Sequence, residues 1–373
     1  MIYLDNSSTT HKKPISVKIA TLKGLSRLSV NPSRSGHKLA INGAEKIYAI
    51  RENISDLLGT TPDNVIFTSG CTMAINLALR GTIKKGGHII TTIYEHNSVL
   101  RTLDLLKKSH NIEVTYLTPN KSGLITSKDI VSKIKSNTYL VIINHTSNVT
   151  GTTQDITSIG KICKKKNLLF MVDGAQSIGH ININMQRQNI NLLTLAGHKG
   201  LYAPEGIGAL LINNCSVSPM IYGGTGTYSD KESQPTEVPD GLESGTINLP
   251  GILGLDAGVN FIRNNFEKIN NKIEKLSSTL IFELNKIKNV KVYGNEKSGV
   301  ISILIKGKDS SLVSNILDEK YSICTRSGLH CAPRVHKYLG TNKTGLTRIS
   351  ISYYNTKREI KKLITAIKEI ALE

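Results

Sequence analysis

Short runs of β-branched and aliphatic residues recur along the first part of the chain, and each is separated from the next by a stretch of helical periodicity. Strands that alternate with helices in this way are typical of βαβ units, which form a mostly parallel sheet with helices on both faces. Ligands bind such a sheet at the carboxyl ends of its strands. We expect strands at residues 64–68, 88–92, 114–117, 140–144, 168–172 and 208–212.

The pattern changes near residue 251, where a helical stretch begins that reaches residue 286. The segment before it, 222–250, is rich in Gly, Thr, Ser and Pro and is expected to be a loop. After it we expect strands at 290–293 and 300–305 and helices at 312–320 and 357–371.

A chain of 373 residues is long enough for two domains. We predict an α/β protein whose central sheet is mostly parallel and covered by helices on both faces, with a smaller α+β C-terminal domain. The large domain comprises residues 15–257. The small domain comprises residues 1–14 and 258–373.

The chain carries 47 Lys and Arg against 28 Asp and Glu, a net charge of +19. This charge would suit nucleic acid, anionic lipid or an acidic protein partner. The lysines are dispersed, however, and their short runs have no interleaved aromatic residues of the kind that stack on bases. Nucleic-acid binding is therefore disfavoured as the main function.

The five cysteines are an odd number and include no C-x-x-C pair, which argues against a disulfide framework or a structural zinc site. The first residues contain no apolar signal segment, and no stretch approaches the ~18 apolar residues of a spanning helix. We expect a soluble cytoplasmic protein with no membrane partner and no metal site.

Lys199 lies in the apolar, glycine-rich segment 195–200, a setting that suits a nucleophilic amine because desolvation lowers the pKa of a lysine. The alternative is a solvated turn lysine. Asp173 directly follows the apolar run 168–172. An acid at that point can pair with the ring nitrogen of pyridoxal phosphate (PLP), although it can also cap a helix.

Two further features lie in the chain order expected of a PLP site. Residues 69–72 follow a strand and open a helical pattern, so their N–H groups and the Thr72 hydroxyl would face an anion. His96 follows the strand 88–92 and is placed to lie against a ring, or to serve as a helix cap. Each signal is weak alone, and together they favour PLP.

Several motifs resemble the class V aminotransferase superfamily, and the resemblance covers nearly the whole chain in collinear order. They lie at residues 3–10, 31–37, 95–98, 147–151, 173–176 and 197–200. The motifs at 223–226, 243–246 and 326–333 resemble cysteine desulfurases of the second group, the selenocysteine-lyase-like branch. The resemblance implies fold type I of the PLP-dependent transferases.

The resemblance also implies a role for each matching residue. Lys199 would hold PLP covalently, Asp173 would pair with the ring nitrogen, and His96 would stack on the ring. Gln176 would bond the ring hydroxyl, while Thr72 and His198 would hold the phosphate. Cys71 stands in the same phosphate cup, where relatives usually have Thr, Gly or Ala.

The remaining roles concern the substrate and a second subunit. Thr246 would reach the phosphate of the other subunit, which implies a homodimer with a shared active site. Asn148 and Arg348 would hold the substrate, with Arg348 clamping its carboxylate, and Arg326 and His37 are assigned to substrate binding as well. Cys331 would be the nucleophile that accepts sulfur.

These roles predict a cysteine desulfurase that converts L-cysteine to L-alanine and leaves a persulfide on Cys331. L-selenocysteine is a second candidate substrate, and an acidic sulfur-acceptor protein is a partner that the positive charge would suit. One alternative is a PLP-dependent selenocysteine lyase, another β-lyase or an aminotransferase that does not use Cys331. A further alternative is a basic nucleic-acid-binding or scaffold protein.

Overall fold

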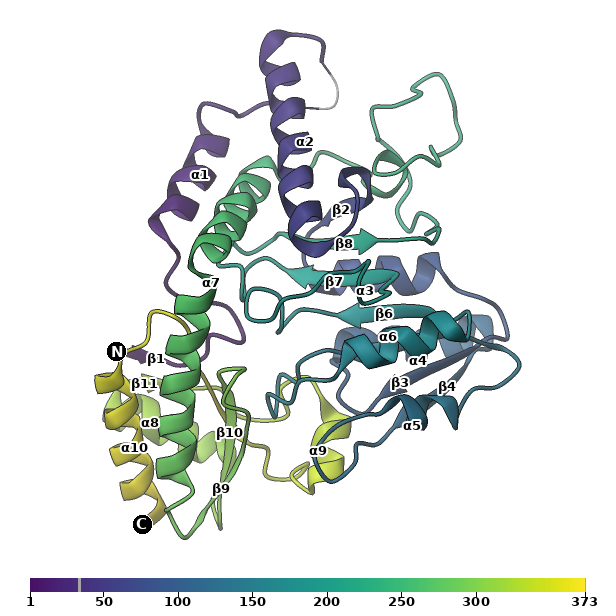
Figure 1. Ribbon diagram of the computed structural model, residues 1–373. Coiled ribbons are helices and arrows are strands. Elements are labelled where there is room, and N and C mark those ends of the chain that lie inside the picture. Colours follow the sequence, from purple (N-terminus) through teal and green to yellow (C-terminus); the bar gives the residue numbers. More distant parts are fainter. Residues whose placement is uncertain (33–34, 373) are drawn as a thin grey trace.

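The computed structural model of the chain describes residues 1–32 and 35–372, which form a large sheet, a small three-stranded sheet and a two-stranded sheet with helices around them (Figure 1). Within the described residues, the large sheet has seven strands, all parallel except β8, which runs antiparallel to both of its neighbours. The predicted α/β fold with a mostly parallel central sheet is therefore confirmed. The strand order is β2 (Val65–Thr68), β8 (Gly208–Ile212), β7 (Leu192–Ala196), β6 (Leu169–Asp173), β5 (Thr138–Asn144), β3 (His88–Thr92) and β4 (Glu113–Leu117).

Helices bury both faces of this sheet. They are α2 (Lys38–Leu58), α3 (Cys71–Gly81), α4 (Asn97–His110), α5 (Ser127–Val131), α6 (Ile156–Lys165) and α7 (Leu249–Leu284). On β5, Val141 and Ile143 join the core formed with α2, α5, α6 and α7, whereas Leu140 and Ile142 join the core formed with α3 and α4. Because successive residues of a strand face opposite sides, a strand covered on both faces is apolar throughout.

The long helix α7 belongs to two cores. Its residues up to Ile273 pack with the large sheet, and those from Leu276 to Leu284 pack with the small one. The small sheet is antiparallel, in the order β12 (Thr347–Ser350), β10 (Val300–Ile305) and β9 (Val290–Gly294), and it packs with α8 (Ser310–Tyr321) and α10 (Lys357–Leu372). The proposed domain boundary at residues 257 and 258 falls inside α7.

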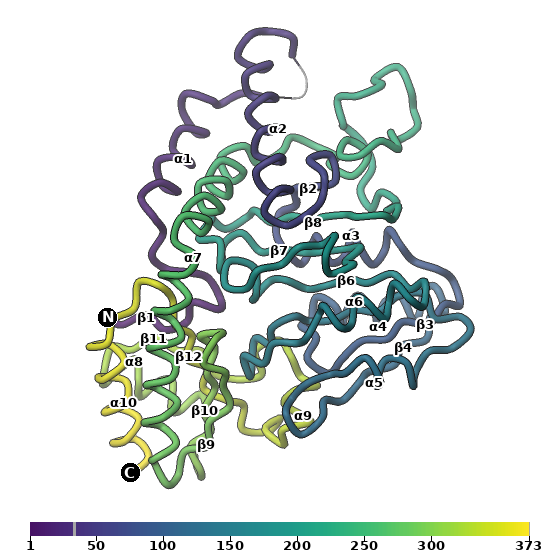
Figure 2. The backbone as a smooth tube through the Cα atoms, in the orientation of Figure 1, coloured from purple at the N-terminus to yellow at the C-terminus, as the bar shows by residue number. Residues whose placement is uncertain are grey.

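The N-terminal segment lies against the C-terminal part of the chain, near α10 (Figure 2). Strand β1 (Ile2–Tyr3) pairs in parallel with β11 (Ile323–Cys324), and Asp5 forms an isolated bridge with Ser350. The chain then continues through α1 (Ile15–Leu25), which runs beside the N-terminal half of α7. The short helix α9 (Pro333–Leu339) follows the segment that contains Cys331.

The sequence analysis did not predict β7. Its residues, Leu192–Ala196, contain one β-branched side chain, Thr194, and the last two were interpreted as part of the apolar segment around Lys199. A central position with strands on both sides and burial on both faces makes this leucine-rich run a strand. In the described part of the chain, no helix is both long and apolar enough to cross a membrane, and all five cysteines are free.

Candidate active site

A cleft of about 270 Å³ opens at the carboxyl ends of the central strands. Other hollows of about 280, 430, 530 and 570 Å³ lie elsewhere in the described part of the chain, and none of them is lined by a predicted site residue. The cleft brings together most of the residues predicted for cofactor binding. Its lining includes Cys71, Thr72, His96, Asn144, Asn148, Asp173, Gln176, His198 and Lys199.

Lys199 follows β7 in a turn that packs closely on a neighbouring loop. A Cβ atom on Gly200 would lie 2.1 Å from the carbonyl oxygen of Ile178, so the residue after the lysine has no room for a side chain. Burial lowers the pKa of Lys199, and nearby Arg348 and Arg326 act in the same direction, whereas Asp173 opposes them. The amine is therefore closer to its neutral, nucleophilic form than a surface lysine is.

Asp173 ends β6 with its carboxylate inside the cleft and 2% of its surface exposed. The carboxylate accepts the N–H of Ala175 at 3.0 Å and the amide Nδ2 of Asn144 at 3.4 Å. The Cys71 thiol donates to the same carboxylate at 3.7 Å. These donors hold the carboxylate in one orientation at the floor of the cleft.

Cys71 and Thr72 form the first turn of α3, whose N-cap is Gly70 with φ of 151°. The Cys71 thiol points toward Asp173 and lies 3.4 Å from the Thr194 hydroxyl. Burial raises the pKa of this thiol, and the charge of Asp173 adds to the effect. No atom would lie within 4 Å of a Cβ on Gly70, which leaves open space before the N–H groups of the helix.

His96 caps α4 and lines the cleft at the same time. Its Nδ1 accepts the N–H of Ser98 at 3.1 Å, which leaves the proton of a neutral ring on Nε2. Burial lowers the pKa of His96, with Asp173 raising it and Lys199 lowering it further. The ring is therefore neutral at neutral pH.

Gln176 and His198 are both tied to the N-terminal segment. The Gln176 Nε2 donates to the carbonyl oxygen of Ser7 at 3.0 Å, and the His198 carbonyl accepts the N–H of Thr10 at 3.0 Å. Burial lowers the pKa of His198 to about 4. The buried Nδ1 of His198 has no hydrogen-bond partner within the described residues, so it is available to a ligand.

Cys331 does not line the cleft but lies in a tightly held loop that is hydrogen-bonded to it. His330 and Cys331 both adopt left-handed conformations, with φ of 48° and 57°. The Asn148 Nδ2 donates to the His330 carbonyl at 2.6 Å, and the Asn97 N–H donates to the Cys331 carbonyl at 2.7 Å. The Cys331 thiol is partly exposed and lies 3.5 Å from Nη2 of Arg326.

Arg348 is almost completely buried, with 1% of its surface exposed. Its Nη2 donates to Asp5 Oδ1 and to the Ser8 hydroxyl, each at 2.8 Å, and its Nη1 donates to the Asn148 carbonyl at 3.2 Å. Nε has no acceptor among the described residues. The two Nη atoms of Arg348, the residue predicted to clamp the substrate carboxylate, are thus already hydrogen-bonded to Asp5, Ser8 and Asn148.

Five predicted site residues do not line the cleft of their own chain. Arg326, Cys331 and Arg348 adjoin it through Asn148, whereas His37 and Thr246 have no contact with its lining residues among the hydrogen bonds of the described chain. His37 is exposed and caps α2 by accepting the Ala40 N–H at 3.2 Å. Thr246 is exposed and accepts a hydrogen bond from Asn31 at 3.5 Å. Ser33 and Arg34, from the predicted motif at 31–37, lie outside the described residues.

The sequence analysis missed two residues that support the cleft. Asn144 ends β5, and its side chain orients Asp173 while its N–H donates to Glu95 Oε1 at 3.0 Å. Glu95 is completely buried, accepts a second bond from Thr92, and has its pKa raised by burial to about 8. The sequence signal that could have identified both residues is a polar side chain at the end of an apolar run.

Comparison with known proteins gives consistent results along the whole chain. The sequence profile of the aminotransferase class-V family matches residues 2–363. A probable cysteine desulfurase of Methanothermobacter thermautotrophicus is 31% identical over 99% of this chain and 94% of its own length. The cysteine desulfurase IscS of Buchnera aphidicola is 34% identical over 98% of this chain and 91% of its own length. The apo structure of a cysteine desulfurase from Thermococcus onnurineus superposes with a TM-score of 0.91 and 31% identity, covering 100% of this chain and 94% of that one.

Proposed function

Because the chain belongs to the aminotransferase class-V family, we propose that it is a PLP-dependent cysteine desulfurase that converts L-cysteine to L-alanine and retains the sulfur as a persulfide on Cys331. The observation that carries the proposal is that the Cys331 loop is hydrogen-bonded to the cleft that contains Lys199 and Asp173. An aminotransferase has no need of a thiol at this position.

The groups in the cleft fit PLP. A lysine of lowered pKa is suited to bind an aldehyde, and a buried carboxylate is suited to a protonated ring nitrogen. The open start of α3 with Thr72, together with the unpartnered Nδ1 of His198, provides hydrogen bonding for a phosphate. His96 would contact the ring, Gln176 would bond its hydroxyl, and Cys71 would lie beneath it next to Asp173.

Bound PLP would supply an electron sink for the substrate. Lys199 holds the cofactor, then takes the proton from Cα of L-cysteine and returns it later in the reaction. Asp173 stabilises positive charge on the ring nitrogen, and its orientation is maintained by Asn144 and Ala175. The neutral His96 carries its proton on Nε2 and is able to donate a hydrogen bond from there into the cleft.

Cys331 accepts the sulfur in a balanced exchange. Its thiolate attacks the sulfur of L-cysteine, the new S–S bond forms and the substrate Cβ–S bond breaks. The electron pair of that bond remains with the substrate carbon, which then takes a proton. The products are L-alanine and one persulfide on Cys331, so no external oxidant or reductant takes part.

Arg348, Arg326, Asn148 and His37 are proposed to bind the substrate. The unpartnered Nε of Arg348 and Oδ1 of Asn148 are buried groups that a ligand would satisfy. A bound carboxylate would also compete with Asp5 for the Arg348 guanidinium. His37 is remote from the cleft of its own chain, so its role requires a second subunit.

A homodimer is proposed because Thr246, like His37, is assigned to the site but lies outside the cleft of its own chain. Thr246 is exposed on its own chain and follows Gly245, around which a Cβ would meet no atom within 4 Å. We propose that Thr246 contacts the phosphate in a second copy.

The cytoplasmic location remains a prediction.

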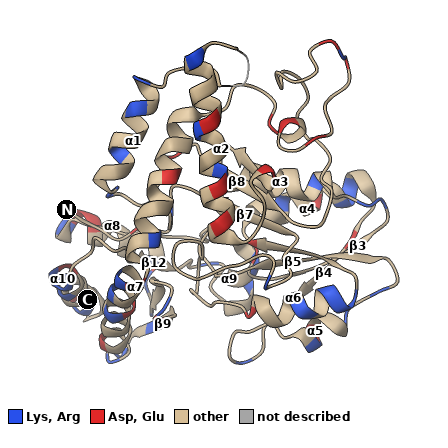
Figure 3. Ribbon diagram, turned by 45° about the horizontal axis from the view of Figure 1, so that its top comes forward, with Lys and Arg blue, Asp and Glu red and all other residues tan. Residues whose placement is uncertain are grey.

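An acidic acceptor protein is the proposed destination of the sulfur. Lys and Arg are spread over helices around both sheets (Figure 3). Residues 258–373 alone carry 21 Lys and Arg against 10 Asp and Glu. Because Cys331 lies in this part of the sequence, an acidic surface would be attracted toward the persulfide.

The test is to incubate the purified, PLP-loaded protein with L-cysteine and measure alanine, sulfide and the mass of the Cys331 peptide. We expect equal yields of alanine and transferable sulfur, with one sulfur atom added at Cys331. Cys331→Ala should keep the visible cofactor absorbance and lose most cysteine turnover, while Cys324→Ala serves as the matched control. Amino-group exchange with a keto acid, or full turnover by Cys331→Ala, would favour the aminotransferase or lyase instead.

A further inference from the structure

The hydroxyl of Ser8 connects two arginines and a carboxylate beside the proposed sulfur acceptor. Arg326 Nη1 donates to the Ser8 Oγ at 3.1 Å, and Arg348 Nη2 donates to it at 2.8 Å. The hydroxyl itself donates to Asp5 Oδ1 at 2.8 Å. A serine hydroxyl has one proton and two lone pairs, so its hydrogen-bonding capacity is completely used.

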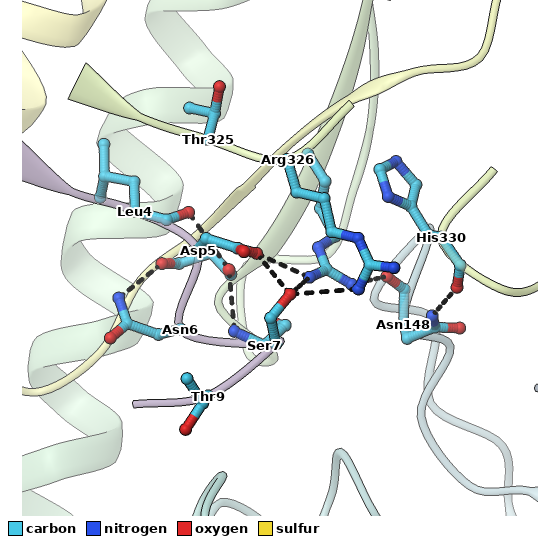
Figure 4. A network of polar contacts seen from close by, with 12 residues as sticks. Leu4, Asp5, Asn6, Ser7, Thr9, Asn148, Thr325, Arg326 and His330 are labelled. Atoms are coloured by element: carbon cyan, nitrogen blue, oxygen red, sulfur yellow. Dashed lines mark hydrogen bonds and ion pairs between the residues drawn. The ribbon is translucent and has the colours of Figure 1, made fainter. Parts of the chain in front are cut away.

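The strand register explains why these residues meet. Strand β1 pairs with β11, the strand that leads to Arg326, and Arg326 forms a bridge with Arg348 on β12. Asp5 forms a bridge with Ser350, two residues beyond Arg348. Three chain segments therefore lie side by side, and Figure 4 shows two of them at Asp5 and Arg326.

The two arginines are anchored unequally. Arg348 is also bonded to Asp5 and to the Asn148 carbonyl. In the described part of the chain, the Arg326 guanidinium hydrogen-bonds only to Ser8 and to the Cys331 thiol. Since like charges repel, and since Arg326 lowers the pKa of Arg348 in addition to the larger effect of burial, the hydroxyl between them holds Arg326 against that repulsion.

We propose that Ser8 is a positioning residue for sulfur transfer, which holds the Arg326 guanidinium against the sulfur of Cys331. The inference rests on the proposed function of Cys331 as the sulfur acceptor. A guanidinium within hydrogen-bond distance stabilises a thiolate and any anionic persulfide formed from it. Ser8 is not among the residues that line the cleft.

Removal of the Ser8 hydroxyl should affect the position of Arg326 more than the position of Arg348. In Ser8→Ala, Arg326 loses its anchor and is repelled by Arg348, while Arg348 keeps Asp5 and Asn148. We therefore expect kcat for cysteine to fall about threefold to tenfold, consistent with the loss of one charge-assisted contact, and KM to rise by a smaller factor, because Arg348 keeps its other bonds. A general loosening of the site would change both constants to the same extent.

The decisive experiment measures the alkylation rate of Cys331 by iodoacetamide, followed by peptide mass spectrometry, in PLP-loaded protein without substrate. At neutral pH, Ser8→Ala should react about threefold to tenfold more slowly than the parent. Ser8→Thr, which keeps the hydroxyl, should recover the parent rate.

Ser7→Ala is the matched control, since the hydrogen bonds of Ser7 to Ser350 and Gln176 use its main chain. It should behave as the parent does. If Ser8→Ala does not fold, Ser8→Cys takes its place as a weaker hydrogen-bonding group. Parent-like neutral alkylation in the Ser8 variant would overturn the inference, as would failure of Ser8→Thr to recover the rate.

These outcomes are distinct from failure of the proposed function. Alkylation requires no substrate, so slow alkylation of Ser8→Ala in a protein without cysteine turnover would support the positioning role and reject the desulfurase. Normal cysteine turnover by the parent, together with parent-like alkylation of Ser8→Ala, would support the desulfurase and reject the positioning role.

Discussion

The thiol of Cys71 donates a hydrogen bond to Oδ1 of Asp173, at 3.7 Å, from the first turn of α3. The thiol is therefore directed at the acid beneath the cleft rather than away from it. Asp173 keeps the Asn144 and Ala175 donors when the thiol is removed. The effect of Cys71 should accordingly be small compared with that of the carboxylate it contacts.

We predict that Cys71→Ser and Cys71→Ala retain PLP with less than about a threefold change in affinity, since only a weak thiol hydrogen bond is altered. Asp173→Asn should retain less PLP and slow the exchange of the Cα proton of cysteine by orders of magnitude. Equilibrium dialysis and proton exchange into deuterated water measure the two effects. Equal behaviour of Asp173→Asn and the parent would remove Asp173 from its assigned role.

The cysteines should differ strongly in reactivity. Burial raises the pKa of Cys163 to about 12 and of Cys215 to about 11, and it also raises those of Cys71 and Cys324. Cys331 is partly exposed and contacts Arg326. We predict that limited alkylation at neutral pH labels Cys331 first, as peptide mapping would show, and prior labelling at Cys163 would contradict the fold.

Glu95 should make the stability of the cofactor-free protein depend on pH. Burial raises its pKa from 4.5 to about 8, so the folded state binds one more proton than the unfolded state between these values. Unfolding free energy should therefore fall as pH rises from about 5 to 8, by at most about 1.4 kcal/mol per pH unit, and level off above that range. Below pH 4.5 the carboxyl is protonated in both states and the slope vanishes.

Glu95→Gln is the matching variant, because an amide resembles the protonated carboxyl in size and cannot ionise. Urea unfolding at several pH values should show a flatter profile in Glu95→Gln than in the parent. The same slope in both proteins would mean that another group is responsible.

The buried ion pair between Arg51 and Glu243 should be important for stability. Arg51 Nη1 and Nη2 donate to the two Glu243 oxygens at 3.0 Å and 2.6 Å, and the side chains are 6% and 7% exposed. Glu243→Ala leaves a buried guanidinium without its partner and should cost about 3–5 kcal/mol of unfolding free energy. Asp104→Ala, which breaks the exposed pair with Lys108, should cost less than about 0.5 kcal/mol in the same urea titration.

Asn148 should control the order of the Cys331 loop. Its Nδ2 donates to the His330 carbonyl at 2.6 Å, and a carboxylate at this position has no proton to donate. Asn148→Asp should therefore increase amide hydrogen exchange in residues 328–332 by about tenfold or more, consistent with loss of a buried hydrogen bond. Unchanged exchange would show that the Asn97 bond alone holds the loop.

Much of the cleft was predictable because polar residues directly follow apolar strands. Asp173 and His96 were placed in this way, and both line the cleft. The direction of the Cys71 side chain was not predictable, since the sequence does not fix how the first turn of α3 is rotated. The Ser8 contact with Arg348 joins residues 340 positions apart, and local patterns carry no signal for such a pairing.

The predicted roles of Thr246 and His37 depend on a second copy of the chain. Thr246 and His37 were predicted at the site from the family resemblance, and both are exposed outside the cleft of their own chain.

Strand β7 was missed because propensity is a weak guide for a strand buried on all sides. The assigned roles of the site residues remain predictions for the experiments above.

The pairing of β1 with β11 has a consequence for biosynthesis. As the chain emerges from a ribosome, residues 65–212 contain all the strands of the large sheet and can pair with one another early. Residues 2–8 must wait for partners at 323–326 and 347–350, more than 300 positions later. Nascent protein can thus form the cleft around Asp173 and Lys199 before Arg326 and Arg348 are synthesised, and the contacts of both arginines with the N-terminal segment form only when translation is nearly finished.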